Sequence, residues 1–314
     1  MGAYILRRAL FLPILLFLGS ILVFTVLRIA PGDPTDRVLG INSTPAEKQK
    51  LRDALGLNDP LPVQYLRWMG GMITFRLGDS IVSDQPIGEQ IITRLKVTLQ
   101  IWIMSVIMGT LFGISFGILS AVFRDTWLDY IVRFMAVVFL SVPAFFSLTL
   151  LIIIPSILWN YVPPLQYVSP FKDFWTNMRI FFPPVFILSL EGSAGFMRLT
   201  RSVCLEVLSQ DYIRTARAKG LREFWVIMRH MFRNAMIPVV TVIGAWIPGI
   251  IAGSVILEQV MSLAGMGQYI YQGVLAKDYP VVQSITLYIG ALVIFANLLV
   301  DISYAYFDPR IRYR

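Results

Sequence analysis

Long apolar runs constrain the fold of this chain more than any other feature. A helix needs about 20 predominantly apolar residues to cross a bilayer. Six stretches meet that length, at residues 5–28, 96–123, 128–158, 180–200, 236–257 and 281–304. Of the 314 residues 56% are hydrophobic and only 15% are charged, which is more apolar than is usual for a soluble domain. The sequence therefore predicts an all-α integral membrane protein with six transmembrane helices.

Lys and Arg in the short connections predict the orientation, because they accumulate on the cytoplasmic side. The connections 159–179 and 258–280 carry few charges. The opposite side holds Arg7, Arg8, Arg124, the basic run 201–233, Arg310, Arg312 and Arg314, whereas the segment 29–95 is too long for this rule to apply. We therefore predict that both termini lie inside (N-in/C-in). The first apolar run, from Ala9 to Leu27, is too long for a signal peptide and indicates an uncleaved anchor.

The segment between the first two spans, residues 29–95, is expected to fold on the extracytoplasmic side. Thr44–Pro45–Ala46–Glu47 is typical of a capping box with proline at the first helical position, and Gly56 is placed to end that helix. A second helix is expected at about 62–69. We divide the chain into 1–95, an anchor helix plus this segment, and 96–314, a five-helix core with a cytoplasmic loop at about 201–235. A docking role and a simple cover over the spans both stay open for the outer segment.

Residue types that support catalysis or metal binding are scarce. One cysteine, Cys204, and one histidine, His230, can form neither a disulfide within the chain nor a His/Cys zinc site. The chain has no G-x-x-x-x-G-K-[ST] motif, so it lacks a phosphate-binding loop and is not expected to hydrolyse ATP. The net charge of +8 fits membrane orientation better than nucleic-acid binding. We expect no catalytic residues, no metal site and no nucleic-acid partner.

Two predicted spans carry small residues at every fourth position, which lines one helix face and lets helix backbones approach closely. The residues are Gly109, Gly113 and Gly117 in the span 96–123, and Ala245, Gly249 and Gly253 in the span 236–257. For the first set we expect packing within the chain. For the second set, packing within the chain and contact with a partner stay open.

The basic stretch 211–238, "DYIRTARAKGLREFWVIMRHMFRNAMIP", lies between apolar runs but is expected outside the lipid. Its first part predicts a short helix with small side chains that ends at Gly220. A second helix, from Leu221 to about Arg233, would place Phe224, Ile227 and Met228 on one face. Such a pair is suited to entering a groove on another protein. Two interfacial helices whose arginines contact anionic lipid would show the same charge pattern.

This stretch resembles the EAA loop of ABC importer permeases, in the form found in the B-type permease of dipeptide, oligopeptide and nickel importers. The resemblance covers nearly the whole chain and rests on these segments: "LRRALFLPILLFLGSILVFTVLRIAPGDP", "QYLRWMGGM", "FRLGDS", "RLTRSVCLEVLSQDYIRTARAKG", "RHMFRNAMIPVV", "KDYPVVQ" and "NLLVDISYAYFDPRIR". The chain departs from the family at Leu190–Glu191–Gly192 and at Ala264–Gly265–Met266–Gly267, and it has Arg214 where the broader EAA pattern has glutamate.

The resemblance implies a type I ABC importer permease in the prokaryotic inner membrane. It implies transport of di- or oligopeptides delivered by an extracytoplasmic binding protein, together with a second related permease and two cytoplasmic ATPase subunits that bind ATP and Mg²⁺. This chain itself would bind no cofactor. Membrane lipid would be a further partner. The loop that contacts an ATPase would comprise Arg214, Thr215, Ala216, Arg217, Ala218, Lys219, Gly220 and Leu221. A nickel or other small-solute importer of the same build stays open, as does an ion-coupled carrier, which would need paired acids at mid-membrane.

Glu191 is the candidate residue for the translocation path. It lies near the middle of the fourth predicted span, where a carboxylate normally faces the interior of a helix bundle or a water-filled cavity. Pairing with another helix is the alternative to contact with a ligand or a role in gating.

Overall fold

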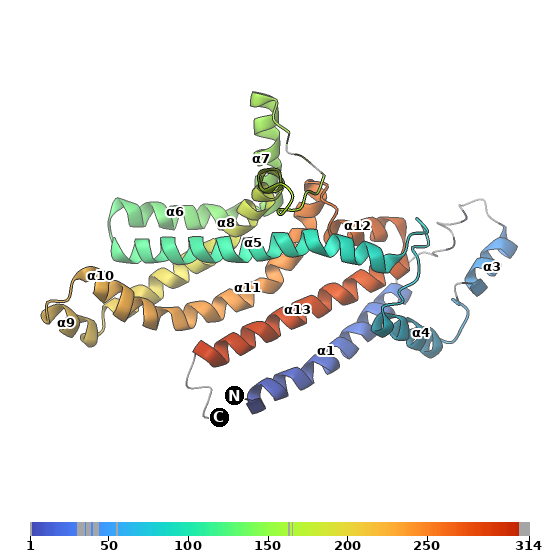
Figure 1. The fold of residues 1–314 in the computed structure, drawn as a ribbon, viewed down its shortest axis with the longest axis horizontal. Coiled ribbons are helices and arrows are strands. Elements are labelled where there is room, and N and C mark those ends of the chain that lie inside the picture. Colours follow the sequence, from blue (N-terminus) through green and yellow to red (C-terminus); the bar gives the residue numbers. More distant parts are fainter. Residues whose placement is uncertain are drawn as a thin grey trace. The chain divides into compact units, whose positions relative to one another are not determined.

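The computed structural model of the chain describes residues 2–29, 35, 39, 44–54, 56–162, 164 and 166–307. Within these ranges the regular structure is helical, apart from one isolated bridge between Asp79 and Pro86. Figure 1 shows the helices, which are α1 (Gly2–Ile29), α3 (Pro45–Ala54), α4 (Leu61–Thr74), α5 (Ile87–Val122), α6 (Trp127–Ser141), α7 (Ala144–Trp159), α8 (Phe174–Leu208), α9 (Asp211–Ala218), α10 (Glu223–Trp225), the π-helix η1 (Val226–Met231), α11 (Phe232–Val260), α12 (Met266–Ala276) and α13 (Tyr279–Phe307).

Four of the described helices are long and apolar enough to cross a membrane, namely α1, α5, α8 and α13. Two bent pairs meet the same criterion if each pair is counted as one span. The first joins α6 to α7 at 98°, and the second joins Glu223–Met236 to Pro238–Gly244 at 45°. The described part of the chain therefore contains up to six candidate spans, which is the predicted number.

The bend between α6 and α7 falls at Val142 and Pro143, inside the predicted third span. Pro143 has no N–H and precedes the first residue of α7, so it cannot continue the hydrogen bonding of α6. Pro155 lies inside α7 without ending it. Of the two prolines that could have interrupted this span, only Pro143 does so.

Two compact units make up the described chain. One comprises Leu99–Met261 and the segment from Ala296 onward, and the other comprises Gly2–Thr98 and Ser262–Phe295. The predicted domain boundary between residues 95 and 96 stays a prediction. By contacts within the structure, residues 262–295 group with the N-terminal part of the chain.

The unit Gly2–Thr98 with Ser262–Phe295 contains the predicted capping box. The Thr44 N–H donates to the Glu47 carboxylate at 2.8 Å, and the Glu47 N–H donates to the Thr44 hydroxyl at 3.3 Å. This hydrogen bonding confirms the start of α3. The helix α5 begins at Ile87, nine residues before the predicted start at 96, because Ile87 and Ile91 are buried against Met266 and other apolar residues of this unit.

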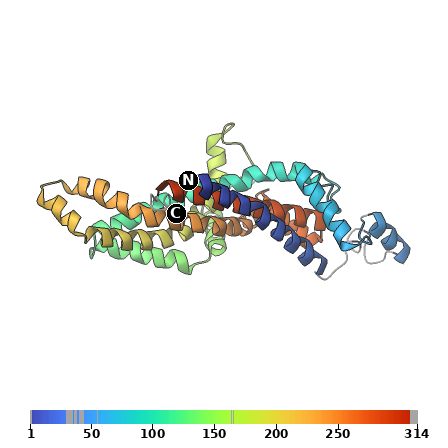
Figure 2. The ribbon, with the colours of Figure 1, turned by 90° about the horizontal axis from the view of Figure 1, so that it is seen from below.

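The unit built on Leu99–Met261 is centred on α8, which contacts α6, α7 and α11. Figures 1 and 2 show α6, α8 and α11 extending side by side, and α7 turned steeply away from α6. Asp173 caps the start of α8 by accepting a hydrogen bond from the Thr176 N–H at 3.1 Å. The short helix α9 lies at the end of the hairpin that α8 and α11 form (Figure 2). Residues of the candidate functional site are therefore carried by α8 and its neighbours.

Candidate functional site

The loop after α8 has a small apolar core of its own. Ile213 and Ala216 from α9 pack with Val226 from η1, and all three are buried. Val207 and Leu208, at the end of α8, cover this cluster. We call Ile213, Ala216 and Val226 the loop core. Because it joins α9 to the end of α8 and to the segment leading into α11, the loop is attached to both helices.

Gly220 closes α9 in the left-handed conformation, with φ of +77°. Its N–H donates to the Arg217 carbonyl at 2.9 Å, and the Leu221 N–H donates to the Ala216 carbonyl at 3.4 Å. Glycine is favoured at such a helix end because it has no Cβ to clash in this conformation. A Cβ added here would meet nothing within 4 Å, so the requirement for glycine comes from the backbone alone.

A two-point ion pair crosses the turn. The Arg217 guanidinium donates to the two carboxylate oxygens of Glu223 at 2.6 and 3.1 Å. Arg217 holds the pKa of Glu223 below its usual value, and Glu223 raises the pKa of Arg217. This paired geometry is more specific than a single contact. It fixes α9 relative to α10.

One prediction about this stretch was wrong. The segment from Leu221 to Arg233 is not one regular α-helix, because the π-helix η1 interrupts it. The residues it buries are Val226 and Met231, five positions apart, while Phe224 and Met228 are exposed. The i, i+3, i+4 pattern assumed 3.6 residues per turn, which a π-helix does not have. Ala216, a member of the loop predicted to contact an ATPase, is buried in the loop core, and its contribution to that contact stays a prediction.

The remaining predicted loop residues form an exposed face. It comprises Arg214, Thr215, Arg217, Ala218, Lys219, Gly220 and Leu221, together with Tyr212, Phe224 and Trp225. We call this set the exposed loop face. It combines positive charge with large apolar side chains, of which Phe224 is 63% exposed and Trp225 is 54% exposed. Exposed apolar side chains gathered in this way are typical of an interaction surface.

The glycines of α5 lie against α8. A Cβ at Gly109 would come within 3.3 Å of the Ser189 carbonyl oxygen, and one at Gly117 would come within 2.5 Å of the Thr200 Cβ. A Cβ at Gly113 would overlap Phe196. Glycine at these three positions lets the two helices approach more closely than any side chain would permit.

Trp246 of α11 explains two glycines at once. A Cβ at Gly109 would lie 2.6 Å from its indole ring, and a Cβ at Gly192 would overlap it. Phe196 packs edge-on against the same ring, with the centroids 4.9 Å apart. Trp246 was not predicted from the sequence, because its contacts come from helices that are distant in the chain.

The small residues of α11 are less uniform. A Cβ at Gly253 would lie 3.0 Å from a Leu188 methyl group, so this position packs on α8. Gly249 is exposed, and only Trp246 lies near it. The side chain of Ala245 lies outside the described residues. The structure thus places one of these three positions in close intrachain packing.

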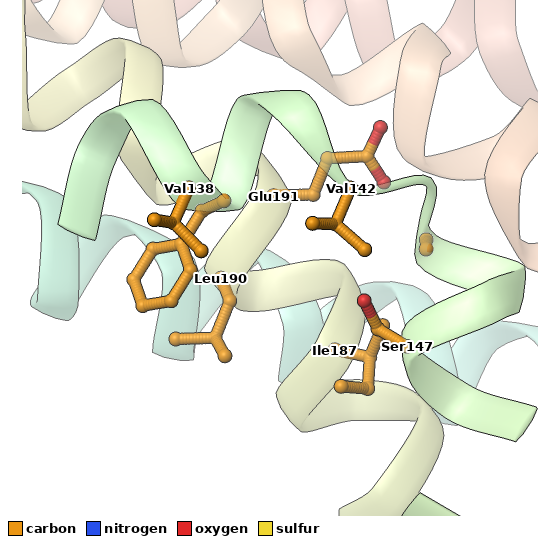
Figure 3. A pocket seen from close by; sticks show the side chains of 8 residues that line it. Val138, Val142, Ser147, Ile187, Leu190 and Glu191 are labelled. Carbon is orange, nitrogen blue, oxygen red and sulfur yellow. The ribbon is translucent and has the colours of Figure 1, made fainter. Parts of the chain in front are cut away.

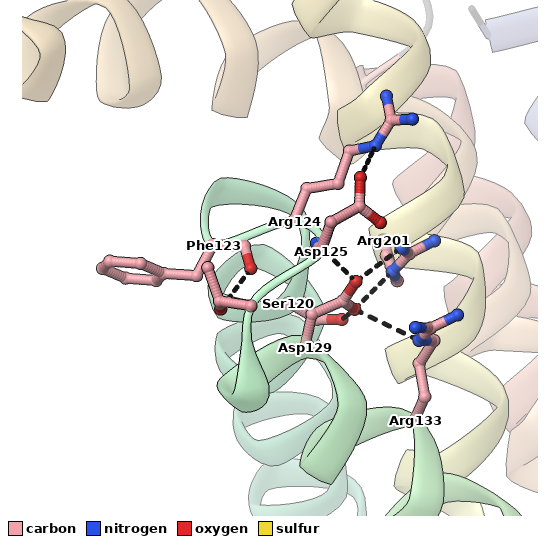
Figure 4. Close-up of polar contacts among 8 residues, drawn as sticks. Ser120, Phe123, Arg124, Asp125, Asp129, Arg133 and Arg201 are labelled. Carbon is pink, nitrogen blue, oxygen red and sulfur yellow. Dashed lines mark hydrogen bonds and ion pairs between the residues drawn. The ribbon is translucent and has the colours of Figure 1, made fainter.

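A buried carboxylate joins α5, α6 and α8 (Figure 4). Asp129 is fully buried and accepts hydrogen bonds from the Arg201 Nε and Nη2 atoms, both at 2.8 Å. The Ser120 hydroxyl donates to it at 2.5 Å, and the Asp125 N–H donates at 3.1 Å. Arg133 lies 3.5 Å away on the same helix. This cluster holds the turn between α5 and α6 against α8.

Glu191 lies at the edge of a pocket of about 170 Å³ near the bend between α6 and α7 (Figure 3). Most residues of the lining are apolar, and Ser147 and Glu191 are polar. Within the described ranges Glu191 has no hydrogen bond or ion pair, and its side chain is exposed. It therefore does not pair with another helix of this chain there. The structure contains no group of three or more His, Cys, Asp or Glu side chains suited to a metal among the residues it describes.

Comparison with known proteins identifies the family. Residues 113–313 match the family described as "Binding-protein-dependent transport system inner membrane component", and residues 1–102 match the N-terminal part of such membrane components. The oligopeptide transport system permease protein AppB of Bacillus subtilis is 38% identical over 317 residues, covering 100% of both chains. The glutathione transport system permease protein GsiC of Escherichia coli O6:H1 is 36% identical over 311 residues, covering 99% of both chains.

A solved structure shares the fold. The crystal structure of an amino acid ABC transporter with histidines aligns with a TM-score of 0.50 at 16% identity, covering 71% of this chain and 94% of that chain. The family matches cover nearly the whole sequence, and the relatives match end to end. The chain belongs to the family of binding-protein-dependent transport system inner membrane components, and it is a permease component of a bacterial ABC transporter, in which ATP hydrolysis is carried out by separate subunits.

Proposed function

We propose that this chain is a membrane-spanning permease subunit of an ATP-driven importer that moves di- or oligopeptides delivered by an extracytoplasmic binding protein. The names of the two relatives, an oligopeptide permease and a glutathione permease, support a peptide substrate. The observation that carries the coupling part of the proposal is the exposed loop face on α9, which is attached to two long helices through the loop core.

The loop is built to transmit movement. Val207 and Leu208 at the end of α8, and Val226 in the segment leading to α11, all contact the buried side of α9. A partner that displaces α9 therefore displaces α8 and α11 together, because packed apolar clusters shift as units. Rigid-body movement of these helices would alternate access to the translocation path.

The partners follow from this proposal. In the predicted orientation α9 is cytoplasmic, where an ATPase subunit would receive the exposed loop face. We propose a second related permease, two ATPase subunits that bind ATP and Mg²⁺, and a substrate-binding protein on the opposite side. This chain would not bind ATP itself, since its sequence lacks a phosphate-binding loop.

The substrate class is tested by ATP hydrolysis in proteoliposomes that contain the complete complex and its binding protein. We expect di-, tri- or longer peptides to stimulate hydrolysis above the rate without substrate. Stimulation by a nickel chelate alone would overturn the peptide assignment and leave the importer architecture in place. Solute uptake by this chain driven by an ion gradient, without ATPase subunits, would overturn the importer proposal and indicate a carrier.

The docking role of the exposed loop face is tested with Ala218, which is exposed at the end of α9. Ala218→Trp should weaken association with the ATPase subunits, because a bulky side chain blocks a close helix-in-groove contact. The matched control is Ala46→Trp, at an exposed alanine of α3. Co-purification of ATPase subunits should fall for Ala218→Trp and not for Ala46→Trp. Equal recovery with both variants would refute the docking role.

A further inference from the structure

Glu191 is a carboxylate in the middle of a long apolar helix, and it has no partner among the residues that the structure describes. It occupies the eighteenth position of the 35-residue helix α8, and no described residue donates a hydrogen bond to it or forms an ion pair with it. A charged side chain at this depth is costly in lipid and normally faces a protein interior or a water-filled cavity. Its exposed side chain in the isolated chain therefore marks a face of α8 that does not face lipid in the membrane.

The packing of α8 sets the direction of Glu191. The next residue, Gly192, lies so close to the Trp246 indole that any Cβ there would overlap it. The side of α8 that carries Gly192 is thus fixed against α11. Residues one position apart on a helix point about 100° apart, so Glu191 is turned away from that contact. Figure 3 shows it beside Val142, at the α6–α7 bend.

The bend itself is a second, independent feature of the same pocket. The chain turns by 98° between α6 and α7, and Pro143 offers no N–H to the carbonyl group of Phe139. Interrupted helices at membrane depth are tolerated where they are buried in protein or line a water-filled cavity. In transporters such interruptions contribute polar backbone groups to substrate sites near the middle of the membrane.

The pocket combines these features. Val138, Phe139 and Val142 line it from α6, Ala144 and Ser147 from α7, and Ile187, Leu190 and Glu191 from α8. Its polar groups include a carboxylate, which only accepts hydrogen bonds when ionised, and a hydroxyl. No basic side chain lines it. The site thus favours a positively charged group with an apolar neighbour.

We propose that Glu191 binds the ammonium group of the substrate as it passes through the membrane, with the apolar walls contacting the adjoining side chain. The inference rests on the proposed peptide-import function and assigns this pocket to the translocation path. A peptide with a free N-terminus presents an ammonium group next to a side chain, which is the combination that the pocket fits.

The test compares Glu191→Gln with the wild type in proteoliposomes that hold the complete complex. Glutamine keeps the size of the side chain and removes its charge. The matched control is Glu206→Gln, at an exposed glutamate near the end of α8 and outside the pocket. Two probes are used with the binding protein saturated: a peptide with a free amino group, and the same peptide acetylated at that group and without other cationic groups.

We expect Glu191→Gln to lower uptake of the free peptide about tenfold, the effect of losing one hydrogen bond to a charged group. For the same variant we expect uptake of the acetylated peptide at the wild-type level. The stimulation of ATP hydrolysis by substrate and the amount of the second permease that co-purifies should also be unchanged. Glu206→Gln should behave like the wild type throughout.

Several results would overturn the inference. Wild-type uptake by Glu191→Gln would show that the carboxylate does not contact the substrate. An equal loss for both probes together with loss of the second permease would show that Glu191 pairs with a cation of that subunit. A wild-type complex that transports no peptide would overturn the proposed function, and this inference with it. Peptide transport that is unaffected by Glu191→Gln would overturn this inference alone.

Discussion

Replacing Arg201 with alanine tests how the turn between α5 and α6 is held against α8. In the native structure the Arg201 guanidinium donates two hydrogen bonds of 2.8 Å to Asp129. The Asp129 side chain is 0% exposed, and that of Arg201 is 21% exposed. The substitution therefore leaves a carboxylate that cannot be rehydrated without opening the contact between α6 and α8.

The magnitude follows from what remains around Asp129. Removing one partner of a buried ion pair costs about 3 to 5 kcal/mol, because the other charge stays buried. The Ser120 hydroxyl and the Asp125 N–H still donate to Asp129, and Arg133 lies within 3.5 Å. We therefore expect the lower end, about 3 kcal/mol of unfolding free energy, which is roughly two orders of magnitude in the equilibrium constant.

The assay is unfolding of the purified chain in mixed detergent micelles, followed by circular dichroism. The matched control is Arg198→Ala, an exposed arginine one turn earlier on α8, which should change stability by less than about 0.5 kcal/mol. Asp129→Ala should cost less than Arg201→Ala, because Arg201 can reach water. The double variant should lose less than the sum of the two. Equal stabilities of Arg201→Ala and Arg198→Ala, or strictly additive losses, would refute the reasoning.

Three further predictions concern the loop and the packing of α8. Gly220→Asn should keep most transport activity and Gly220→Val should lose it, because a β-branched residue tolerates the φ of +77° poorly; equal uptake by both would contradict this. Gly192→Ala should destabilise the chain by about 1 to 3 kcal/mol in the detergent assay, while Gly195→Ala, with nothing within 4 Å of its Cβ, should not. The protection factors of the loop amides, which correct for the intrinsic pH dependence of exchange, should fall as the pH drops below the usual pKa of a glutamate, about 4.3. The pKa of Glu223 is lowered by Arg217, so the ion pair stabilises the loop above that value and is lost as Glu223 is protonated. Protection factors that do not change with this protonation would argue against the ion pair.

The helical architecture could be predicted from the lengths of the apolar runs. Backbone N–H and C=O groups without hydrogen bonds are costly in lipid, which leaves few alternatives to a helix. The capping box at Thr44 and the end of α9 at Gly220 were also predictable, since both depend on residues close together in sequence. A proline inside an apolar run, such as Pro143, is a place where a helix can bend. The angle of 98° could not be predicted, because it depends on what the two halves pack against.

The pairing of Asp129 with Arg201 could not be predicted from the sequence. The two residues are 72 positions apart, and α8 carries other arginines, such as Arg198, that were equally plausible partners. Which arginine of α8 lies next to Asp129 depends on how α6 and α8 are rotated about their axes. The same reason hides Trp246, which reaches Gly109 and Gly192 from a third helix. Long-range partners of this kind depend on the packing that the residues themselves help to create.

The π-helix η1 makes the length of the loop matter as much as its side chains. Buried residues follow one another at Val226, Met231, Ala235 and Val239, so the interval is five positions once and four positions afterwards. A turn of π-helix holds about one residue more than a turn of α-helix, so η1 accommodates that residue while Val226 stays on the buried side. Removing one residue from η1 and restoring regular α winding would keep that side buried. Removing one residue from the regular part of α11 would instead turn everything before it by about 100° about the helix axis. The exposed loop face would then point away from its present direction with every one of its residues intact. The rotational phase between this face and the membrane helix is thus encoded by the number of residues in each turn, which no substitution within the face can correct.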